Sequence, residues 1–144
     1  GPLWERGLDY NHGTGHGVGY LLNVHERPAG IRYKVVPERM DSAAFEPGMV
    51  CSDEPGLYIE GSHGIRTENL VFCKEAEKTS FGQFLCFEYL TFVPIDLDAI
   101  DTRYMEPGQI DLLNRYHAQV REKMTPFMTP EELVWLNDAT REVR

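Results

Sequence analysis

Three of the five histidines in this 144-residue chain lie within a stretch of fourteen positions. They are His12, His16 and His25, and glycines alternate from Gly13 to Gly19 between the first two and just beyond them. A neutral imidazole binds divalent metal ions and carries protons, and glycine lets the backbone approach a ligand closely. The glycines follow neither the GxGxxG nor the Gly-Lys-Ser/Thr pattern, which argues against a phosphate-binding loop. The cluster therefore favours a metal or proton-transfer site over histidines spaced by chance.

A second candidate feature is a pair of carboxylates, Glu54 and Glu68, each seven residues from Gly61. In a hairpin symmetric about Gly61 they would face each other across the strands. Opposed like charges destabilise a sheet by up to about 1 kcal/mol where solvated, and a cation between them would turn this cost into binding. Two alternatives stay open, namely solvated strand carboxylates or one carboxylate paired with Arg66. A kink at Pro55 would break the assumed register.

Arg66 is the third candidate, because it lies two residues from Glu68 and so on the same face of a strand. An arginine beside a carboxylate holds that carboxylate ionised and oriented. A salt bridge at a strand edge explains the residue equally well. One imidazole with two carboxylates suits Mn²⁺, Co²⁺ or Zn²⁺ better than copper.

Strands are expected to position these residues. Residues 49–59 and 65–73 are rich in apolar side chains and flank a turn at 60–64, which predicts an antiparallel hairpin. Residues 31–36 form a short alternating run, and residues 84–95 predict a further strand bounded by Pro94. Glycine at every second position excludes a stable helix before Asn23 and suits a close-packed loop or strand.

The C-terminal part changes to helical spacing. Apolar residues recur from Ile110 to Val120, predicting a helix that opens at Pro107 and ends near Pro126. Thr129 followed by proline predicts the N-cap of a last helix. We therefore expect an α+β fold in a single domain, 1–144, with a strand-rich half at 1–95 and a helical extension at 96–144.

Composition and net charge limit the classes of partner that this chain can bind. Hydrophobic residues make up 42% of the chain, enough for a core, and the formal net charge of −9 disfavours nucleic acid and anionic membranes as partners. The apolar run at 89–95 is too short to cross a bilayer, and no signal-peptide pattern opens the sequence. The three cysteines contain no CxxC pair, so we expect buried free thiols and a cytoplasmic location.

Read in order, five motifs resemble one family, Xaa-Pro aminopeptidase (aminopeptidase P) of the M24 metallopeptidases. Any one of these motifs alone is weak evidence for the family, but five of them in this order and spacing are specific. The last motif and the helical tail resemble the longer, three-domain form more than prolidase or methionine aminopeptidase. The motifs are His12-Gly-Thr-Gly-His16-Gly-Val-Gly, Asn23-Val-His25-Glu, Asp53-Glu54-Pro-Gly-Leu-Tyr58, Gly64-Ile-Arg66-Thr-Glu68-Asn and Phe87-Glu-Tyr-Leu-Thr-Phe-Val-Pro-Ile.

The resemblance implies the C-terminal half of a pita-bread fold, a curved antiparallel sheet with C-terminal helices around two divalent ions. Mn²⁺ is favoured, with Zn²⁺ and Co²⁺ as alternatives. His16 and Glu54 would bind one ion and Glu68 would bridge both, while His12 and His25 would flank the substrate.

The resemblance also implies that Tyr58 and Arg66 contact the metal ligands and orient them without binding the metal themselves. A bridging water made acidic by the metals would attack the bond before a penultimate proline, and Glu54 would carry its proton.

The family takes two further aspartate ligands from a segment upstream of these motifs. We therefore expect the 144 residues alone to hold one ion or none, to show no useful peptidase activity, and to self-associate as a dimer. Three alternatives stay open: prolidase, a non-catalytic peptide-binding module on the same fold, and a metal-free hydrolase like creatinase. Retention of His16, Glu54 and Glu68 argues against the last two.

Overall fold

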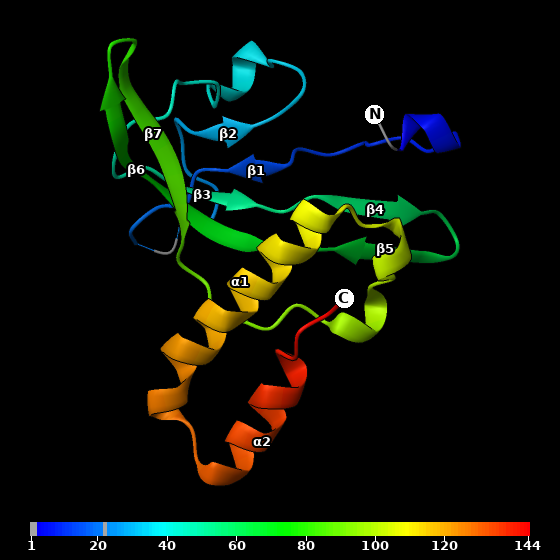
Figure 1. Ribbon diagram of the computed structural model, residues 1–144. Helices are drawn as coiled ribbons and strands as arrows, with labels where there is room; N and C mark the ends of the chain where they lie inside the picture. Colours follow the sequence, from blue (N-terminus) through cyan, green and yellow to red (C-terminus); the bar gives the residue numbers. More distant parts are fainter. Residues whose placement is uncertain (1–2, 22) are drawn as a thin grey trace. The chain divides into compact units, whose positions relative to one another are not determined.

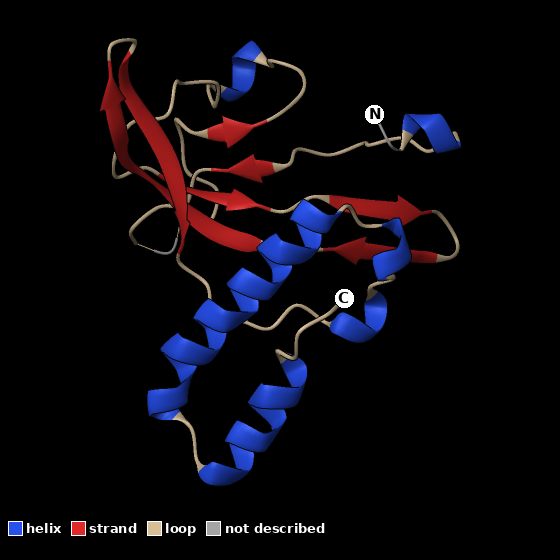
Figure 2. Ribbon diagram, in the orientation of Figure 1, coloured by secondary structure: helices blue, strands red, loops and turns tan. Residues whose placement is uncertain are grey.

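The computed structural model describes residues 3–21 and 23–144, and the chain divides into two compact units, residues 1–91 and 92–144 (Figure 1). The first unit holds all the strands and the second holds both α-helices (Figure 2). The single domain predicted from the sequence, with its division between residues 95 and 96, stays a prediction. The elements are β1 (Gly15–His16), β2 (Gly30–Ile31), β3 (Val50–Asp53), β4 (Gly56–Ile59), β5 (His63–Arg66), β6 (Asn69–Thr79), β7 (Gly82–Tyr89), α1 (Pro107–Met124) and α2 (Pro130–Ala139).

The strands of the first unit pair only with antiparallel neighbours, in three small sheets. β1 pairs with β2, β4 pairs with β5, and the third sheet has the order β3-β6-β7. Of the alternating run at 31–36, only Ile31 enters a strand. The buried apolar residues of this unit are Ala29, Cys51, Val71 and Cys73.

The predicted hairpin about Gly61 is present, but each arm is broken into two strands. β3 pairs with β6 from Val50↔Phe72 to Asp53↔Asn69, and β4 pairs with β5 from Gly56↔Arg66 to Ile59↔His63. Both stretches keep the same symmetry about Gly61, so the register predicted from the sequence is confirmed on each side of the break. The interruption falls at Pro55, which has no N–H to donate to a ladder.

Glycine at positions 15 and 17 is required by close approach of the backbone. A Cβ at Gly15 would lie 2.0 Å from the Ser52 carbonyl oxygen, and one at Gly17 would lie 2.1 Å from the Glu26 carbonyl oxygen. Contacts under 3.0 Å exclude any side chain here. The alternating glycines therefore let β1 run between β2 and β3, where the Gly17 N–H donates to Ala29 and the Val18 N–H donates to Val50.

The strand predicted at 84–95 begins earlier and ends at Tyr89, as β7. In the segment after Tyr89, backbone groups at Val93 and Ile95 form hydrogen bonds with side chains of α1. Tyr116 Oη donates to the Val93 carbonyl (2.8 Å), and the Ile95 N–H donates to His117 Nε2 (3.0 Å). Pairing with two helical side chains explains why the apolar, aromatic run does not continue as a strand.

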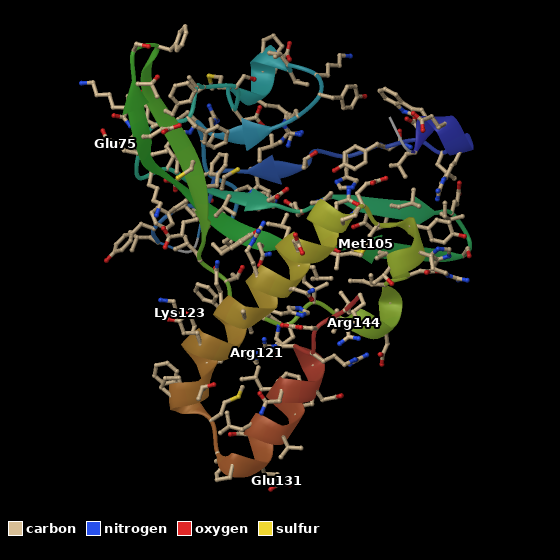
Figure 3. All side chains as sticks on the ribbon, viewed as in Figure 1. Glu75, Met105, Arg121, Lys123, Glu131 and Arg144 are labelled. Atoms are coloured by element: carbon tan, nitrogen blue, oxygen red, sulfur yellow. The ribbon has the colours of Figure 1, made fainter. Side chains whose placement is uncertain are left out.

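The second unit is built from α1 and α2, as the helical spacing predicted. α1 buries Leu113, Tyr116, His117 and Val120 on one face, and α2 buries Leu136. The Arg121 guanidinium donates to the Thr140 carbonyl, and Figure 3 places Arg121 between the two helices. Among the described residues, neither helix combines the length and the apolar character needed to span a bilayer.

The predicted N-cap of α2 is confirmed in detail. The Glu132 N–H donates to Thr129 Oγ1 (3.3 Å), while the Thr129 N–H donates to Glu132 Oε2 (2.8 Å). This reciprocal arrangement satisfies donors that a helix N-terminus leaves free. It also lowers the pKa of the Glu132 carboxyl below its ordinary value, because two Thr129 hydrogen bonds favour the ionised form.

Candidate functional site

His16 and Glu54 form the centre of the site. His16 lies on β1, and Glu54 follows β3 directly, with its N–H donating to the Thr14 carbonyl (2.7 Å). This backbone bond draws the two side chains together, so that His16 Nε2 lies 2.9 Å from Glu54 Oε1. Glu54 is 7% exposed. A buried carboxylate of this kind needs a positive partner.

The tautomer of His16 is restrained by its own strand. Nδ1 lies 3.1 Å from the Gly17 carbonyl oxygen, an acceptor, so this contact is a hydrogen bond only when Nδ1 carries a proton. In the neutral ring that leaves the Nε2 lone pair facing a carboxylate oxygen. The 2.9 Å contact then requires a proton or a cation between the two atoms. A metal-binding histidine is commonly oriented in this way, with its second nitrogen donating to a carbonyl.

Two further side chains hold the Glu54 carboxylate. The Ser52 hydroxyl donates to Oε1 at 2.9 Å, and Arg66 Nη1 lies 3.1 Å from Oε2. The sequence placed Arg66 beside Glu68, but the structure pairs it with Glu54 across the strands. Glu54 lies two residues before Gly56, the register partner of Arg66, so Glu54 and Arg66 are diagonal neighbours across the hairpin.

Ser52 was missed by the sequence reasoning. It is fully buried, and its oxygen also accepts the His16 backbone N–H at 3.0 Å. One hydroxyl thus ties together the two central residues. A small polar residue at alternate strand spacing from Glu54 was the only available signal in the sequence.

His12 and Tyr58 lie to one side of the centre. The His12 ring packs edge-on against Tyr58, with centroids 5.4 Å apart, and the Arg66 guanidinium carbon lies 5.4 Å from the same tyrosine ring. Both nitrogens of His12 face carbonyl oxygens, Nδ1 at 2.6 Å from Gly13 and Nε2 at 3.0 Å from Gly56. Carbonyls only accept, so both contacts are hydrogen bonds when both nitrogens carry protons.

His25 approaches the centre from the loop after β1. Its ring centroid lies 4.2 Å from that of His16. The structure therefore brings together six of the seven residues singled out as catalytic or metal-binding: His12, His16, His25, Glu54, Tyr58 and Arg66.

Glu68 is the seventh residue, and it is exposed in the break between β5 and β6. It occupies the register position opposite Glu54, because the pairing is symmetric on both sides and the Thr67 N–H donates to the Pro55 carbonyl (3.1 Å). Over residues 3–21 and 23–144, no group of three His, Cys, Asp or Glu side chains is gathered closely enough to hold a metal ion.

The donor set nevertheless fits half of a divalent-metal site. His16 and the buried Glu54 carboxylate, 2.9 Å apart, would be two of the ligands of a bound divalent ion. Imidazole and carboxylate suit Mn²⁺, Zn²⁺ and Co²⁺. The Ser52, Arg66 and Gly17 contacts supply the outer hydrogen bonds that orient such ligands.

Cys51, on the strand that precedes Glu54, takes no part in this donor set. It is fully buried. Burial, followed by the charges of Asp53 and Glu54, raises the pKa of its thiol to about 11. The thiol therefore stays protonated near neutral pH, a form that neither binds metal nor reacts as a nucleophile.

A network around Asp41 forms the wall next to the histidines. Asp41 Oδ2 accepts from Arg32 at 2.9 and 2.8 Å and from Arg39 at 3.3 Å. Burial of Asp41 opposes its ionisation, but the hydrogen bonds and charges of these two arginines outweigh it, so its pKa lies below the ordinary 3.8. The sequence reasoning missed this network, because no spacing rule links residues 32, 39 and 41.

The chain matches the family described as metallopeptidase family M24 over residues 1–75, and the C-terminal region of peptidase M24 over residues 83–143. It belongs to metallopeptidase family M24. The resemblance inferred from the five motifs is thereby confirmed.

Named relatives in the M24 family agree with this assignment. A probable Xaa-Pro aminopeptidase P of Arthroderma otae is 46% identical over 98% of this chain and 23% of its own length. Xaa-Pro aminopeptidase 2 of Mus musculus is 42% identical over 96% of this chain and 20% of its own length. The chain therefore spans less than a quarter of the length of either relative.

A solved structure shows the fold. X-prolyl aminopeptidase from Caenorhabditis elegans, described as a cytosolic enzyme with a di-nuclear active site, matches with a TM-score of 0.82 and 37% identity. The match covers 98% of this chain and 23% of that protein. The chain thus has the α+β fold of the C-terminal part of a pita-bread domain, as its motifs predicted.

Proposed function

We propose that this M24 chain supplies part of the active site of a metal-dependent aminopeptidase, which releases the N-terminal residue from peptides with proline in second position. The observation that carries the proposal is the 2.9 Å contact of His16 with Glu54, flanked by His12 and His25. The named Xaa-Pro aminopeptidases, with identities from 41% to 46%, support the choice of proline specificity over other M24 activities.

His16, Glu54 and Glu68 are the residues proposed to hold metal, with Mn²⁺ favoured and Zn²⁺ or Co²⁺ as alternatives. The di-nuclear site of the Caenorhabditis elegans enzyme supports two ions in a protein of full family length. A bound divalent ion would lower the pKa of a bound water molecule toward neutrality and would polarise the scissile carbonyl.

The remaining roles belong to groups of the chain itself. His12 and His25 are proposed to orient the substrate carbonyl and to donate hydrogen bonds to its oxygen as charge develops there. Glu54 is proposed to carry a proton to the leaving nitrogen. Arg66 keeps the Glu54 carboxylate in position through the 3.1 Å contact, and Tyr58 packs between Arg66 and His12.

Substrate length tests the reaction class. A protein of full family length that carries this chain should hydrolyse an Xaa-Pro-Yaa tripeptide with Mn²⁺ and should lose that activity on chelation. Cleavage of the Xaa-Pro dipeptide alone would identify a prolidase instead. Binding of the tripeptide without cleavage would identify a peptide-binding module, and activity indifferent to chelation would point to a metal-free hydrolase.

The 144 residues alone should bind one ion or none and should not cleave the tripeptide. The absence of a three-donor group in the described residues supports this proposal. Measurable cleavage by the isolated chain would contradict it.

We also propose a cytosolic location and self-association as a dimer. The description of the Caenorhabditis elegans enzyme as cytosolic supports the first proposal. Exposed aromatic side chains on β7, Phe84 at 49% and Phe87 at 48%, support the second. Light scattering after size-exclusion chromatography would measure the molecular mass of the 144-residue chain. A monomer at all protein concentrations would refute the dimer.

A further inference from the structure

Two hollows share the arginines of the Asp41 network as lining residues. One, of about 240 Å³, is lined by His16 and His25, and the other, of about 420 Å³, is lined by His12. Arg32 and Arg39 line both. The network therefore forms a shared wall that reaches the three histidines of the candidate site.

The two hollows differ in charge. The hollow beside His16 is balanced, because its three arginines meet the three carboxylates of Glu26, Glu38 and Asp41. The hollow beside His12 is lined by the cations Arg32, Lys34 and Arg39 and, among its described lining residues, by no carboxylate. Counting Asp41 behind the wall still leaves a net charge of +2 there, in a chain whose net charge is −9.

The cations of the His12 hollow have separate tasks. The Arg32 guanidinium is held by Asp41 through two contacts and packs against Gly13, where its Nη1 would lie 2.5 Å from a Cβ. Arg39 touches Asp41 only through Nε, and its side chain is 56% exposed. Lys34 is exposed as well. Arg39 and Lys34 are thus the exposed cations that line this hollow.

We propose that the hollow formed by Lys34, Arg39 and His12 binds a carboxylate on the substrate, on the side of the peptide that follows the proline. This inference rests on the proposed function, since it takes His12 as the residue next to the scissile bond. The carboxylate is either an acidic side chain or the C-terminus of a short peptide. Both present the same charge to the same cations.

Equilibrium binding tests the proposal, using a protein of full family length that carries this chain and a chelator to prevent turnover. Two matched pairs of fluorescent peptides separate the sources of the carboxylate. Ala-Pro-Asp-amide is compared with Ala-Pro-Asn-amide for the side chain, and Ala-Pro-Ala acid with Ala-Pro-Ala amide for the C-terminus. At least one charged peptide should bind about 2- to 30-fold more tightly than its neutral partner at low salt, the range expected for two exposed ion pairs.

Variants then locate the effect. The double variant Lys34→Gln/Arg39→Gln should abolish the preference for the charged peptide, as should 0.5 M salt, through screening. The matched control Lys78→Gln/Arg115→Gln removes the same charge from exposed positions on β6 and α1 and should retain the preference. Equal binding within both peptide pairs, or an equal loss in the control variant, would overturn the proposal. Peptide preference without hydrolysis in the presence of Mn²⁺ would overturn the proposed function alone.

Discussion

Ser52 offers the sharpest test of how the site is held together. Replacing it with alanine removes the hydroxyl that donates to Glu54 Oε1 at 2.9 Å and accepts the His16 N–H at 3.0 Å. A hydrogen bond to a charged group contributes about 1.5–3 kcal/mol, and an unsatisfied buried donor costs about 1–3 kcal/mol. We expect Ser52→Ala to lower the free energy of unfolding by about 2–4 kcal/mol, because Arg66 still holds the carboxylate.

Metal affinity should fall as well. Loss of an outer hydrogen-bond partner typically lowers metal affinity by about 10- to 100-fold. Mn²⁺ titration of a protein of full family length, followed by electron paramagnetic resonance, would measure this change beside a urea unfolding curve. Ser52→Thr keeps the hydroxyl and should restore much of the affinity, while Ser62→Ala in the exposed β4–β5 turn serves as a matched control. An unchanged Mn²⁺ affinity in Ser52→Ala would refute the positioning role of Ser52.

Three further predictions follow from burial. Burial and the nearby Arg121 guanidinium lower the pKa of His117 below 6.5, so the contribution of His117 to stability is complete above pH 6.5 and is lost as the pH falls through the lowered pKa. Urea unfolding from pH 8 to 5 should show this loss of stability, and His117→Gln should make the stability depend less on pH. Cys86 is half-buried and should react with a thiol reagent in the folded protein, while Cys51 should react only on unfolding, so rapid labelling of Cys51 would contradict its burial. Leu136→Ala should cost about 2–5 kcal/mol of unfolding free energy, and the exposed Leu112→Ala about 0.5 kcal/mol or less.

The sequence predicted those parts of the fold that depend on local chemistry. Proline at the first helical position and the Thr129 cap defined the starts of α1 and α2, and the symmetry about Gly61 predicted the pairing of four strands. The end of β7 depended on distant partners. Tyr116 and His117 take the backbone groups at Val93 and Ile95, and no local pattern reveals that exchange.

The candidate site divides in the same way. His12 and His16 were found because histidines alternate with glycines there, and Glu54 because it and Glu68 lie at equal spacing from Gly61. The spacing placed Arg66 on the strand face of Glu68 and left open which carboxylate it pairs with; the structure pairs it with Glu54. The support from Ser52 and the wall around Asp41 are three-dimensional arrangements of common polar residues, and such residues carry no signal in sequence alone.

Metal content tests the central claim most directly. In a protein of full family length that carries this chain, mass spectrometry after Mn²⁺ loading should find about two ions per chain. His16→Ala should lower this to one or none and should remove tripeptide hydrolysis, whereas the matched change His63→Ala in the exposed β5 strand should leave both unchanged. Two ions and full activity in His16→Ala would contradict the account.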